Sequence, residues 1–204
     1  AITAPNTNED AAPVAIDLLA TAADVDTTDD LDVDSVVVTS SDGRNLSFTV
    51  DNATGAFSVN PNQYSDLAAG ESETVTVSYD VVDGNGGVVA NTATVTIEGR
   101  NDAPTASGGS GSVTEDVTMS ANGTIAVADP DTSDTHSFSV QDGGAGSYGA
   151  LSVDGSGNWS YALSNGAANV QALTSGQTVY ENFTVDVSDG NGGETMANIK
   201  VAVT

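Results

Sequence analysis

The fold is decided by residues 74–87, which read TVTVSYDVVDGNGG. Polar and apolar residues alternate from Thr74 to Val81, so every second side chain falls on one face of an extended chain. The pentapeptide at 83–87 then supplies Asp, Asn and Gly, of which Asn and Gly tolerate the positive φ of a tight turn. Alternation resumes after the turn over residues 93–97. The stretch therefore predicts a β-hairpin with one buried face.

The chain is a tandem repeat. The pentapeptide returns unchanged at residues 189–193, 106 positions later, again after an alternating run. The same offset relates the Glu-Asp pair at 9–10 to the pair at 115–116. Pro104 stiffens the chain just after the first repeat's last predicted strand. We therefore predict two domains, residues 1–102 and residues 103–204.

The pattern of short strands predicts an all-β fold. Each repeat holds about seven short runs that favour strands, separated by turn residues, and neither repeat has a helical period. This number and spacing are typical of an immunoglobulin-like β-sandwich. Besides the two hairpins, the predicted strands are 33–39, 46–50, 56–59, 124–128, 136–140, 151–153 and 159–163.

The net charge narrows the classes of partner. The 204 residues carry a formal charge of −26, and the only cationic side chains are Arg44, Arg100 and Lys200. Nucleic acid and anionic membrane surfaces require clustered Lys and Arg, so we expect neither as a partner. The sequence has no run of eighteen apolar residues, so we expect no membrane insertion. The self-repulsion of so many carboxylates favours a bound cation as the counter-charge.

The scarcity of Cys and His in the sequence indicates which cation the chain could bind. The chain has no Cys and a single histidine, His136, so thiolate sites and sites built from several His residues are excluded. The remaining ligands are oxygen atoms, which suit Ca²⁺ with its six to eight oxygen neighbours. The sequence also lacks a nucleophile elbow and a phosphate-binding loop, and it singles out no pair of carboxylates. We predict no catalytic residues and no enzyme activity.

Aspartates recur at matching places in the loops of both repeats. Asp129 and Asp131 come before a predicted strand, and Asp189 opens the last hairpin turn. The first repeat has Asp24, Asp26 and Asp83 at the matching places. In an antiparallel sandwich these two loops can meet at one pole, where like charges raise each other's pKa unless a cation lies between them. The alternative is that they are ordinary solvated turn aspartates.

These residues and their surroundings resemble a known family. The pairs at 9–10 and 115–116, the Asp129-Pro130-Asp131 sequence, Asp189, and the linker 101–104 (NDAP) are similar to calcium-binding cadherin-type domains. Residues 112–116, 128–141, 148–154 and 158–161 further resemble VCBS-type repeats of very large secreted bacterial adhesins of the RTX type. The first repeat fits the bacterial cadherin-like pattern more loosely. The resemblance implies two tandem cadherin-like β-sandwiches in an end-to-end arrangement.

The resemblance also implies a calcium site at the junction of the two domains. Its implied ligands are Glu9, Glu71, Asn101, Asp102, Asp129, Asp131 and Asp189. Weaker candidates are Asp24, Asp26, Asp83 and Glu115. Glu71 departs from the family, because its counterpart in the second repeat is Gln177 and the chain lacks the acidic pair that cadherins carry there.

Chain length bears on the position of Glu115. The 13 residues from Asp102 to Glu115 can span roughly 43 Å when extended, which is enough to cross a sandwich to its far pole. There Glu115 would serve a following linker, and by the same reasoning Asp24, Asp26 and Asp83 would serve a preceding one. If the first strand instead folds back early, Glu115 would lie with Asp129 and Asp131.

These features predict a structural role. We expect a spacer from the stalk of a secreted bacterial cell-surface adhesin, stiffened by Ca²⁺, monomeric, with neighbouring repeats of the same chain as its partners and biofilm or host contacts made through other regions. The alternative is a calcium-dependent module that binds carbohydrate or protein through an exposed aromatic side chain. Trp159 and its counterpart Phe57 are expected in the core. Tyr148 and Tyr180 are left open.

Overall fold

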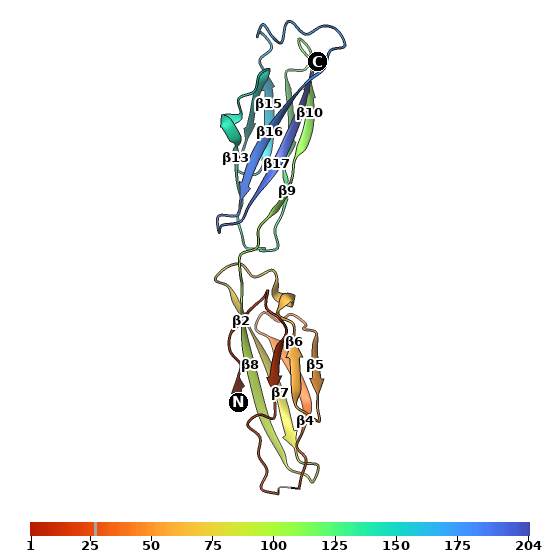
Figure 1. Cartoon of the computed structure of the whole chain (residues 1–204), viewed down its shortest axis with the longest axis vertical. Helices are drawn as coiled ribbons and strands as arrows, with labels where there is room; N and C mark the ends of the chain where they lie inside the picture. The colour runs from red at the N-terminus through yellow and green to blue at the C-terminus, as the bar shows by residue number, and fades with distance from the viewer. Residues whose placement is uncertain (27) are drawn as a thin grey trace. The chain divides into compact units, whose positions relative to one another are not determined.

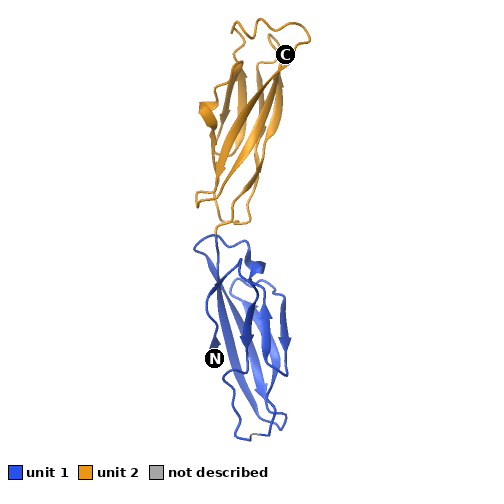
Figure 2. Ribbon diagram, viewed as in Figure 1, with its two compact units in different colours: residues 1–100 blue, residues 101–204 orange. Residues whose placement is uncertain are grey.

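The computed structural model describes residues 1–26 and 28–204 and divides the chain into two compact units. Unit 1 is residues 1–100 and unit 2 is residues 101–204 (Figure 2). The division falls between Arg100 and Asn101, two residues before the predicted boundary. Each unit is described by itself below.

Unit 1 is a β-sandwich with two sheets (Figure 1). The larger sheet contains β4, β7 and β8, with the short strands β1 and β2 both paired to β8. The smaller sheet has the order β3-β6-β5. The strands are β1 (Ile2–Thr3), β2 (Thr7–Asn8), β3 (Val14–Asp17), β4 (Asp32–Ser40), β5 (Phe48–Asp51), β6 (Ala56–Val59), β7 (Ser72–Val82) and β8 (Val88–Glu98).

Unit 2 repeats this plan. One sheet has the order β10-β17-β16-β13, a second has the order β11-β15-β14, and β9 pairs with β12. The strands are β9 (Thr105–Ser107), β10 (Gly109–Val113), β11 (Ser120–Thr124), β12 (Ala126–Ala128), β13 (Ser137–Val140), β14 (Gly149–Val153), β15 (Asn158–Leu163), β16 (Val179–Ser188) and β17 (Glu194–Val203).

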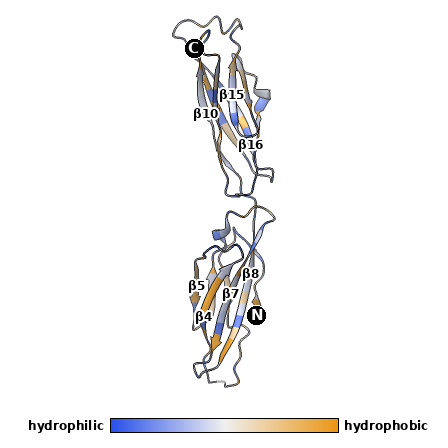
Figure 3. Cartoon of the chain, turned by 180° about the vertical axis from the view of Figure 1, so that it is seen from behind, coloured by the Kyte–Doolittle hydropathy of each residue, from blue (hydrophilic) through white to orange (hydrophobic). Residues whose placement is uncertain are grey.

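The predicted hairpins are confirmed. β7 pairs antiparallel with β8 from Ser72↔Glu98 to Val82↔Val88, with the pentapeptide between them. Polar and apolar residues alternate along these strands (Figure 3), and the inward positions Val75, Val77 and Ile97 are fully buried. The sandwich core of each unit is built from such inward positions. The all-β class with two tandem domains is therefore as predicted.

Two aromatic side chains occupy the core as expected. Phe57 is 1% exposed in unit 1 and Trp159 is 2% exposed in unit 2. The Trp159 indole lies against two glycines, because a Cβ on Gly111 or Gly123 would come within 3.1 Å or 2.6 Å of the ring. An aromatic side chain of this size needs such gaps in the strands around it.

Helical structure in the described residues is limited to two short 3₁₀ turns, η1 (Pro61–Tyr64) and η2 (Gln141–Gly144). Pro61 at the start of η1 fixes the local φ, and the Asn60 side chain accepts the N–H of Asn62 at 3.1 Å. Within this described part, no helix has the length and apolar character needed to cross a membrane.

Candidate metal centre

The repeated pentapeptide fixes the side chain of its own aspartate. In unit 2, Asp189 Oδ1 accepts the N–H groups of Asn191 at 2.7 Å and Gly193 at 2.9 Å. Gly192 has a φ of +113°, which favours glycine. A Cβ on Gly193 would lie 2.1 Å from Asp189 Oδ2, so the carboxylate can fold over the turn only because that residue is glycine. The turn thereby holds Asp189 in one orientation.

Three carboxylates meet at this turn. Asp129, Asp134 and Asp189 each contribute an oxygen atom, and these atoms lie within 4.8 Å of one another. Asn191, from the same turn, donates its Nδ2 to Asp134 Oδ1 at 2.9 Å. Asp129 Oδ1 accepts the N–H of Asp131 at 3.1 Å, and Asp129 Oδ2 lies 2.8 Å from His136 Nε2. We call these three residues the unit 2 cluster.

The first residues of unit 2 close over this cluster. Asn101 donates its Nδ2 to Asp189 Oδ2 at 3.0 Å, and Asp102 donates its backbone N–H to Asp131 Oδ2 at 2.9 Å. Asp131 is 1% exposed and Asp189 is 2% exposed. Five predicted ligands, Asn101, Asp102, Asp129, Asp131 and Asp189, are therefore brought together in unit 2.

Several buried oxygen atoms at this place lack a hydrogen-bond donor. Within the described residues they are Asn101 Oδ1, Asp131 Oδ1 and Asp134 Oδ2. An ionised carboxylate has only acceptor atoms, so the neighbouring aspartates cannot satisfy one another. A buried acceptor without a partner costs free energy, and a buried charge costs more. A cation in contact with these oxygens would remove both costs.

The pKa values of Asp131 and Asp189 are shifted in opposite directions. Burial raises the pKa of Asp131, and the charges of Asp134, Asp102 and Asp129 raise it further. Burial alone would also raise the pKa of Asp189, but hydrogen bonds from Asn101 and from the N–H groups of Asn191 and Gly193 outweigh it and lower that pKa. Asp189 is therefore a preformed anion, whereas Asp131 carries its charge at a cost.

The donor set fits Ca²⁺. It offers carboxylate and amide oxygens, the ligands that Ca²⁺ prefers, in a site with no thiolate. The residues able to hold such an ion in unit 2 are Asn101, Asp102, Asp129, Asp131, Asp134 and Asp189.

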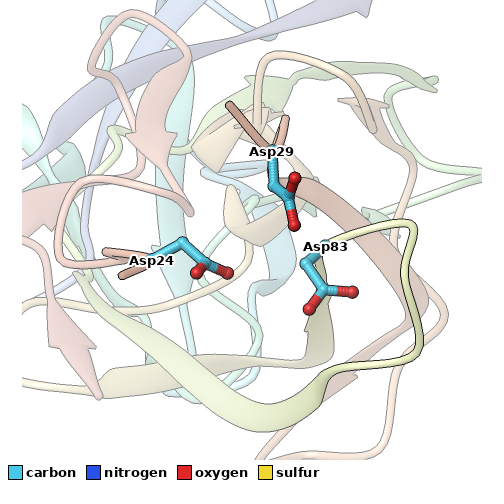
Figure 4. A group of neighbouring side chains, drawn as sticks. All are labelled: Asp24, Asp29 and Asp83. Carbon is cyan, nitrogen blue, oxygen red and sulfur yellow. The ribbon is translucent and has the colours of Figure 1, made fainter. Parts of the chain in front are cut away.

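Unit 1 has a matching cluster of Asp24, Asp29 and Asp83, which converge from two loops (Figure 4). Asp83 Oδ1 accepts the N–H groups of Asn85 at 2.7 Å and Gly87 at 2.8 Å, and these bonds lower the pKa of Asp83. Asn85 donates its Nδ2 to Asp29 Oδ2 at 2.8 Å, as Asn191 does to Asp134. Asp24 is exposed here. We call these three residues the unit 1 cluster.

Asp26 stands beside this cluster rather than in it. Its N–H donates to Asp24 Oδ1 at 2.8 Å, and its side chain is exposed. Its counterpart Asp131 makes the same bond to Asp129 but is buried under Asn101 and Asp102. The matching backbone geometry is therefore present in both units, and only unit 2 has the covering residues in the described chain.

Two further predicted ligands lie at the end of unit 1 that is next to the linker in sequence. Glu9 is fully buried, and its Oε1 accepts the N–H of Arg100 at 2.6 Å. Glu71 accepts the N–H of Gly99 with its backbone oxygen at 2.9 Å, while its Oε2 accepts the N–H of Ala68 at 3.0 Å. Gln177 receives the equivalent bond from Thr174 at 3.2 Å, so the side chain of Glu71 also has a turn-forming role.

Glu115 lies at the end of unit 2 opposite the cluster. β10 runs parallel to β17, and the Glu115 N–H donates to the Thr204 oxygen at 2.8 Å, just beyond the end of β17. The turn that holds Asp189 precedes the other end of this 10-residue strand, about 33 Å away. The first strand therefore does not fold back early, and Glu115 is not beside Asp129. Glu115 Oε2 is buried without a hydrogen-bond donor among the described residues.

Asp29 and Asp134 are cluster members that the sequence interpretation did not select. Both recur, 105 positions apart, in the same loops as the selected aspartates. The Asn of the repeated pentapeptide could have indicated them. Its side-chain amide donates to Asp29 in unit 1 and to Asp134 in unit 2.

Each unit matches a family model of known domains. Residues 101–204 match the family model described as "Bacterial cadherin-like domain", and residues 1–98 match the one described as "Cadherin-like domain". No curated protein sequence matches the chain.

Solved structures of cadherin repeats share the fold. Human CDH23 EC21-23 matches with a TM-score of 0.58 at 20% identity, over 99% of this chain and 72% of that one. Mouse PcdhgC3 EC1-3 matches with a TM-score of 0.51 at 19% identity, over 100% of this chain and 65% of that one. Drosophila N-cadherin EC1-4 matches with a TM-score of 0.50 at 16% identity, over 100% and 47%. At these identities the likeness shows the fold alone.

Proposed function

This chain belongs to the cadherin-like domains, one in each unit, and on that premise we propose that it is a calcium-stiffened structural spacer. The observation that carries the proposal is the set of buried oxygens in unit 2 that have no donor among the described residues. Their removal from water is costly without a cation and favourable with one. Cadherin-like domains are typically calcium-binding adhesion or extender repeats, and the acidic clusters are consistent with that class.

We further propose that the ion in unit 2 also restrains the linker to unit 1. The backbone N–H that Glu9 accepts belongs to Arg100, and a peptide bond joins Arg100 to Asn101, whose amide binds Asp189. The residue whose N–H Glu9 accepts is therefore the direct sequence neighbour of the first candidate ligand of unit 2. Glu9, and Glu71 beside Gly99, are therefore proposed to complete the ion's shell from the side of unit 1. An ion held by both units would fix the domains end to end.

The experiment is thermal unfolding of the full chain in Ca²⁺ and in chelator at equal ionic strength. An ion bound only by the folded state stabilises it by about 2.7 kcal/mol at a hundredfold excess over its dissociation constant. Mg²⁺ should stabilise the fold less, because it prefers a smaller octahedral shell and dehydrates reluctantly. Identical midpoints in Ca²⁺ and chelator would refute the proposal. Small-angle scattering with and without Ca²⁺ then reports whether the two units align.

The setting we propose is the surface of a bacterium, as part of a secreted adhesin whose neighbouring repeats contact this pair. The support is the description of the family model that matches unit 2 and the extracellular character of cadherin repeats. The VCBS and RTX context rests on the sequence resemblance. Antibody labelling of intact cells that express the parent protein would test the location.

The second candidate is a calcium-dependent carbohydrate-binding module. Tyr180 favours it, since this side chain is 58% exposed and lines a hollow with Tyr148 and Asn182. However, the Lys200 ammonium lies 4.0 Å from the Tyr180 ring centroid, so the ring face that a sugar would stack on already has a cation. A glycan array separates the two functions, because a pure spacer binds no sugar.

A further inference from the structure

The dipeptide Asn-Gly occurs four times in the chain, at residues 85–86, 122–123, 165–166 and 191–192. Asn is among the chemically labile residues of proteins. When glycine follows it, the side-chain amide is especially open to attack by the next backbone nitrogen, because glycine has no Cβ to hinder the approach. The four sites share this sequence, so the structure around each decides which of them reacts.

The site at 122–123 is held by its strand. Asn122 and Gly123 lie in β11, where they pair with Ser160 and Trp159 of β15. A Cβ on Gly123 would come within 2.6 Å of the Trp159 ring, so the backbone there has little room to rotate. Attack on the amide requires such a rotation, and the paired strand opposes it.

The site at 165–166 is held through its side chain. Asn165 Oδ1 accepts the N–H of Asp116 at 2.9 Å, and Asn165 Nδ2 donates to Asp116 Oδ1 at 2.8 Å. The backbone oxygen of Asn165 also accepts Gln171 Nε2 at 2.8 Å. These bonds restrain both ends of the amide that the Gly166 nitrogen would have to attack.

The site at 191–192, in the repeated pentapeptide of unit 2, is more open. Asn191 is exposed, and its Nδ2 donates to Asp134 at 2.9 Å. Gly192 has a φ of +113°, and an added Cβ would meet no described atom within 4 Å. Among the turn N–H groups that lower the pKa of Asp189, that of Gly192 contributes less than those of Asn191 and Gly193. The attacking nitrogen is therefore the least firmly held of the three.

The site at 85–86 has the same geometry in unit 1. Asn85 is exposed, and its Nδ2 donates to Asp29 at 2.8 Å. Gly86 has a φ of +112° and the same open surroundings among the described residues. Its N–H again contributes less to the lowered pKa of Asp83 than those of Asn85 and Gly87. Gly87 is exposed whereas its counterpart in unit 2 is buried, so this turn is the less restrained of the two.

We propose that Asn85 and Asn191 are sites of spontaneous deamidation in the folded chain. The Gly192 nitrogen loses its proton to solvent and attacks Asn191 Cγ. The new C–N bond closes a cyclic imide, the Cγ–Nδ2 bond breaks, and Nδ2 takes up a proton from solvent and leaves as ammonia. Water then opens the ring at either C–N bond and leaves Asp or isoaspartate. The net reaction consumes water and releases ammonia, with no oxidant or reductant, and Asn85 reacts with Gly86 in the same way.

The reaction changes the carboxylate cluster beside each site. Asn191 Nδ2 donates to Asp134, and a carboxylate in its place has only acceptor atoms. Conversion therefore replaces a hydrogen bond with the repulsion of two like charges. The modification itself does not depend on the proposed calcium function, because the reacting atoms all belong to the turn.

The test incubates the full chain in chelator at mildly alkaline pH, once folded, as confirmed by circular dichroism, and once unfolded in urea. Peptide mapping by mass spectrometry follows the deamidated fraction at each of the four sites. In the folded chain, we expect Asn85 and Asn191 to react at least about tenfold faster than Asn122, a difference of roughly 1.4 kcal/mol in the activation barrier. In urea the four rates should converge, because the dipeptide is the same.

The variant Asp116→Gly tests whether structure causes the selection. Glycine tolerates the φ of +58° at this residue and removes the acceptor of Asn165 Nδ2. Asn165 should then react faster than in the native chain, while Asn85 and Asn191 keep their rates. Folded-state rates at Asn85 and Asn191 no greater than those at Asn122 or Asn165 would overturn the proposal. An Asn165 rate that the variant leaves unchanged would overturn the structural reason for the selection.

Discussion

At the scale of single residues, Asp131 is a buried carboxylate with one oxygen that lacks a donor among the described residues. It is 1% exposed, its Oδ2 is fixed by the Asp102 N–H, and its Oδ1 has no donor among the described residues. Burial and the charges of Asp134, Asp102 and Asp129 raise its pKa. Its ionised form therefore destabilises the folded state in the absence of a cation and becomes a ligand in its presence.

The effect of Asp131→Asn on the stability of unit 2 should have opposite signs with and without Ca²⁺. Asn keeps an oxygen for the Asp102 N–H and removes the charge, so we expect unfolding of unit 2 in chelator to become less favourable by on the order of 1 kcal/mol. In saturating Ca²⁺ the same variant should be less stable than the native chain, because a charged ligand is lost. Trp159 fluorescence melts in both buffers check this. Destabilisation in both buffers would show that Asp131 has only a structural role.

The pH dependence of the same variant follows from the raised pKa. An aspartate with a raised pKa penalises the folded state above that pKa, and the penalty fades as pH falls toward its unfolded value of 3.8. In chelator, the stability difference between Asp131→Asn and the native chain should therefore shrink as pH falls from 7 to about 4. Comparing the two chains cancels the opposite contributions of Asp189 and Asp83, whose pKa values are lowered. A difference that grows on acidification would contradict the assignment.

Recurrence between the repeats located most of the cluster from sequence. Asp129 and Asp189 stand at matching places with Asp24 and Asp83, and a shared pole follows from antiparallel topology. Asp29 and Asp134 were not predicted, because aspartates in loops follow no periodic pattern that marks a ligand. Only their hydrogen bonds to the side-chain amides of Asn85 and Asn191 distinguish them from other loop aspartates. Which oxygen atoms lack a donor depends on side-chain geometry, and no sequence pattern encodes it.

At the scale of elements, a neighbouring strand and a strand of the other sheet in unit 2 leave space for the Trp159 ring. Gly123 lies on β11 directly opposite Trp159 on β15, and an added Cβ would come within 2.6 Å of the ring. Gly111 on β10 leaves space for the far edge of the same indole. Glycine weakens a strand in isolation, so its use here reflects the volume of the ring.

Gly123→Ala should therefore destabilise unit 2 by about 1–3 kcal/mol, because the ring is held in a packed core and cannot move aside freely. The matched control is Gly155→Ala, whose added Cβ would meet nothing within 4 Å and whose φ is not positive. The control should change stability by less than about 0.5 kcal/mol. Chemical denaturation followed by Trp159 fluorescence measures both. Equal effects would mean that the indole is not held by these strands.

The long hairpins and the short strands β6, β13, β14 and β15 could be predicted from sequence, whereas the two-residue strands and the glycine-containing β11 could not. β7, β8, β16 and β17 each have 10 or 11 residues, enough for alternation to stand out. β1 and β2 have 2 residues each, and β11 reads SANGT, whose pairing is decided by contact with β15 rather than by propensity. Tertiary context commonly overrides strand propensity in such segments.

At the scale of the whole molecule, the charge of −26 opposes every compact state of the chain. The three cationic side chains have other partners than the clusters. Arg44 is engaged with Asp42 and Asp66, Arg100 lies 3.5 Å from Asp10, and Lys200 lies over Tyr180. Long-range repulsion and the local cost at each cluster should respond differently to ions. Simple salt screens the first, whereas a bound divalent ion removes the second.

We therefore expect NaCl and CaCl₂ to act separately. In chelator, raising NaCl from about 0.02 M to about 0.5 M should raise the unfolding temperature gradually, since screening shortens the Debye length. At constant ionic strength, Ca²⁺ should add a further, saturable increase that follows a binding isotherm. Differential scanning calorimetry across the NaCl series and the Ca²⁺ series measures the screening effect and the binding effect separately. A Ca²⁺ effect that merely follows ionic strength would mean that the clusters are ordinary solvated carboxylates.

The proposed shared ion makes a prediction that reaches from one unit to the other. Glu9 belongs to unit 1, yet Glu9→Gln should raise the dissociation constant of the tightest calcium site by about tenfold, the loss of roughly 1.4 kcal/mol. The variant keeps an oxygen for the Arg100 N–H, so the local fold is retained. Glu98→Gln is the control, because it removes the same charge from a solvent-exposed side chain whose Oε1 accepts the Asn6 amide at 2.8 Å. Isothermal titration calorimetry of both variants decides the matter: if Glu9→Gln binds Ca²⁺ as Glu98→Gln does, the ion is held by unit 2 alone and the linker is free to bend.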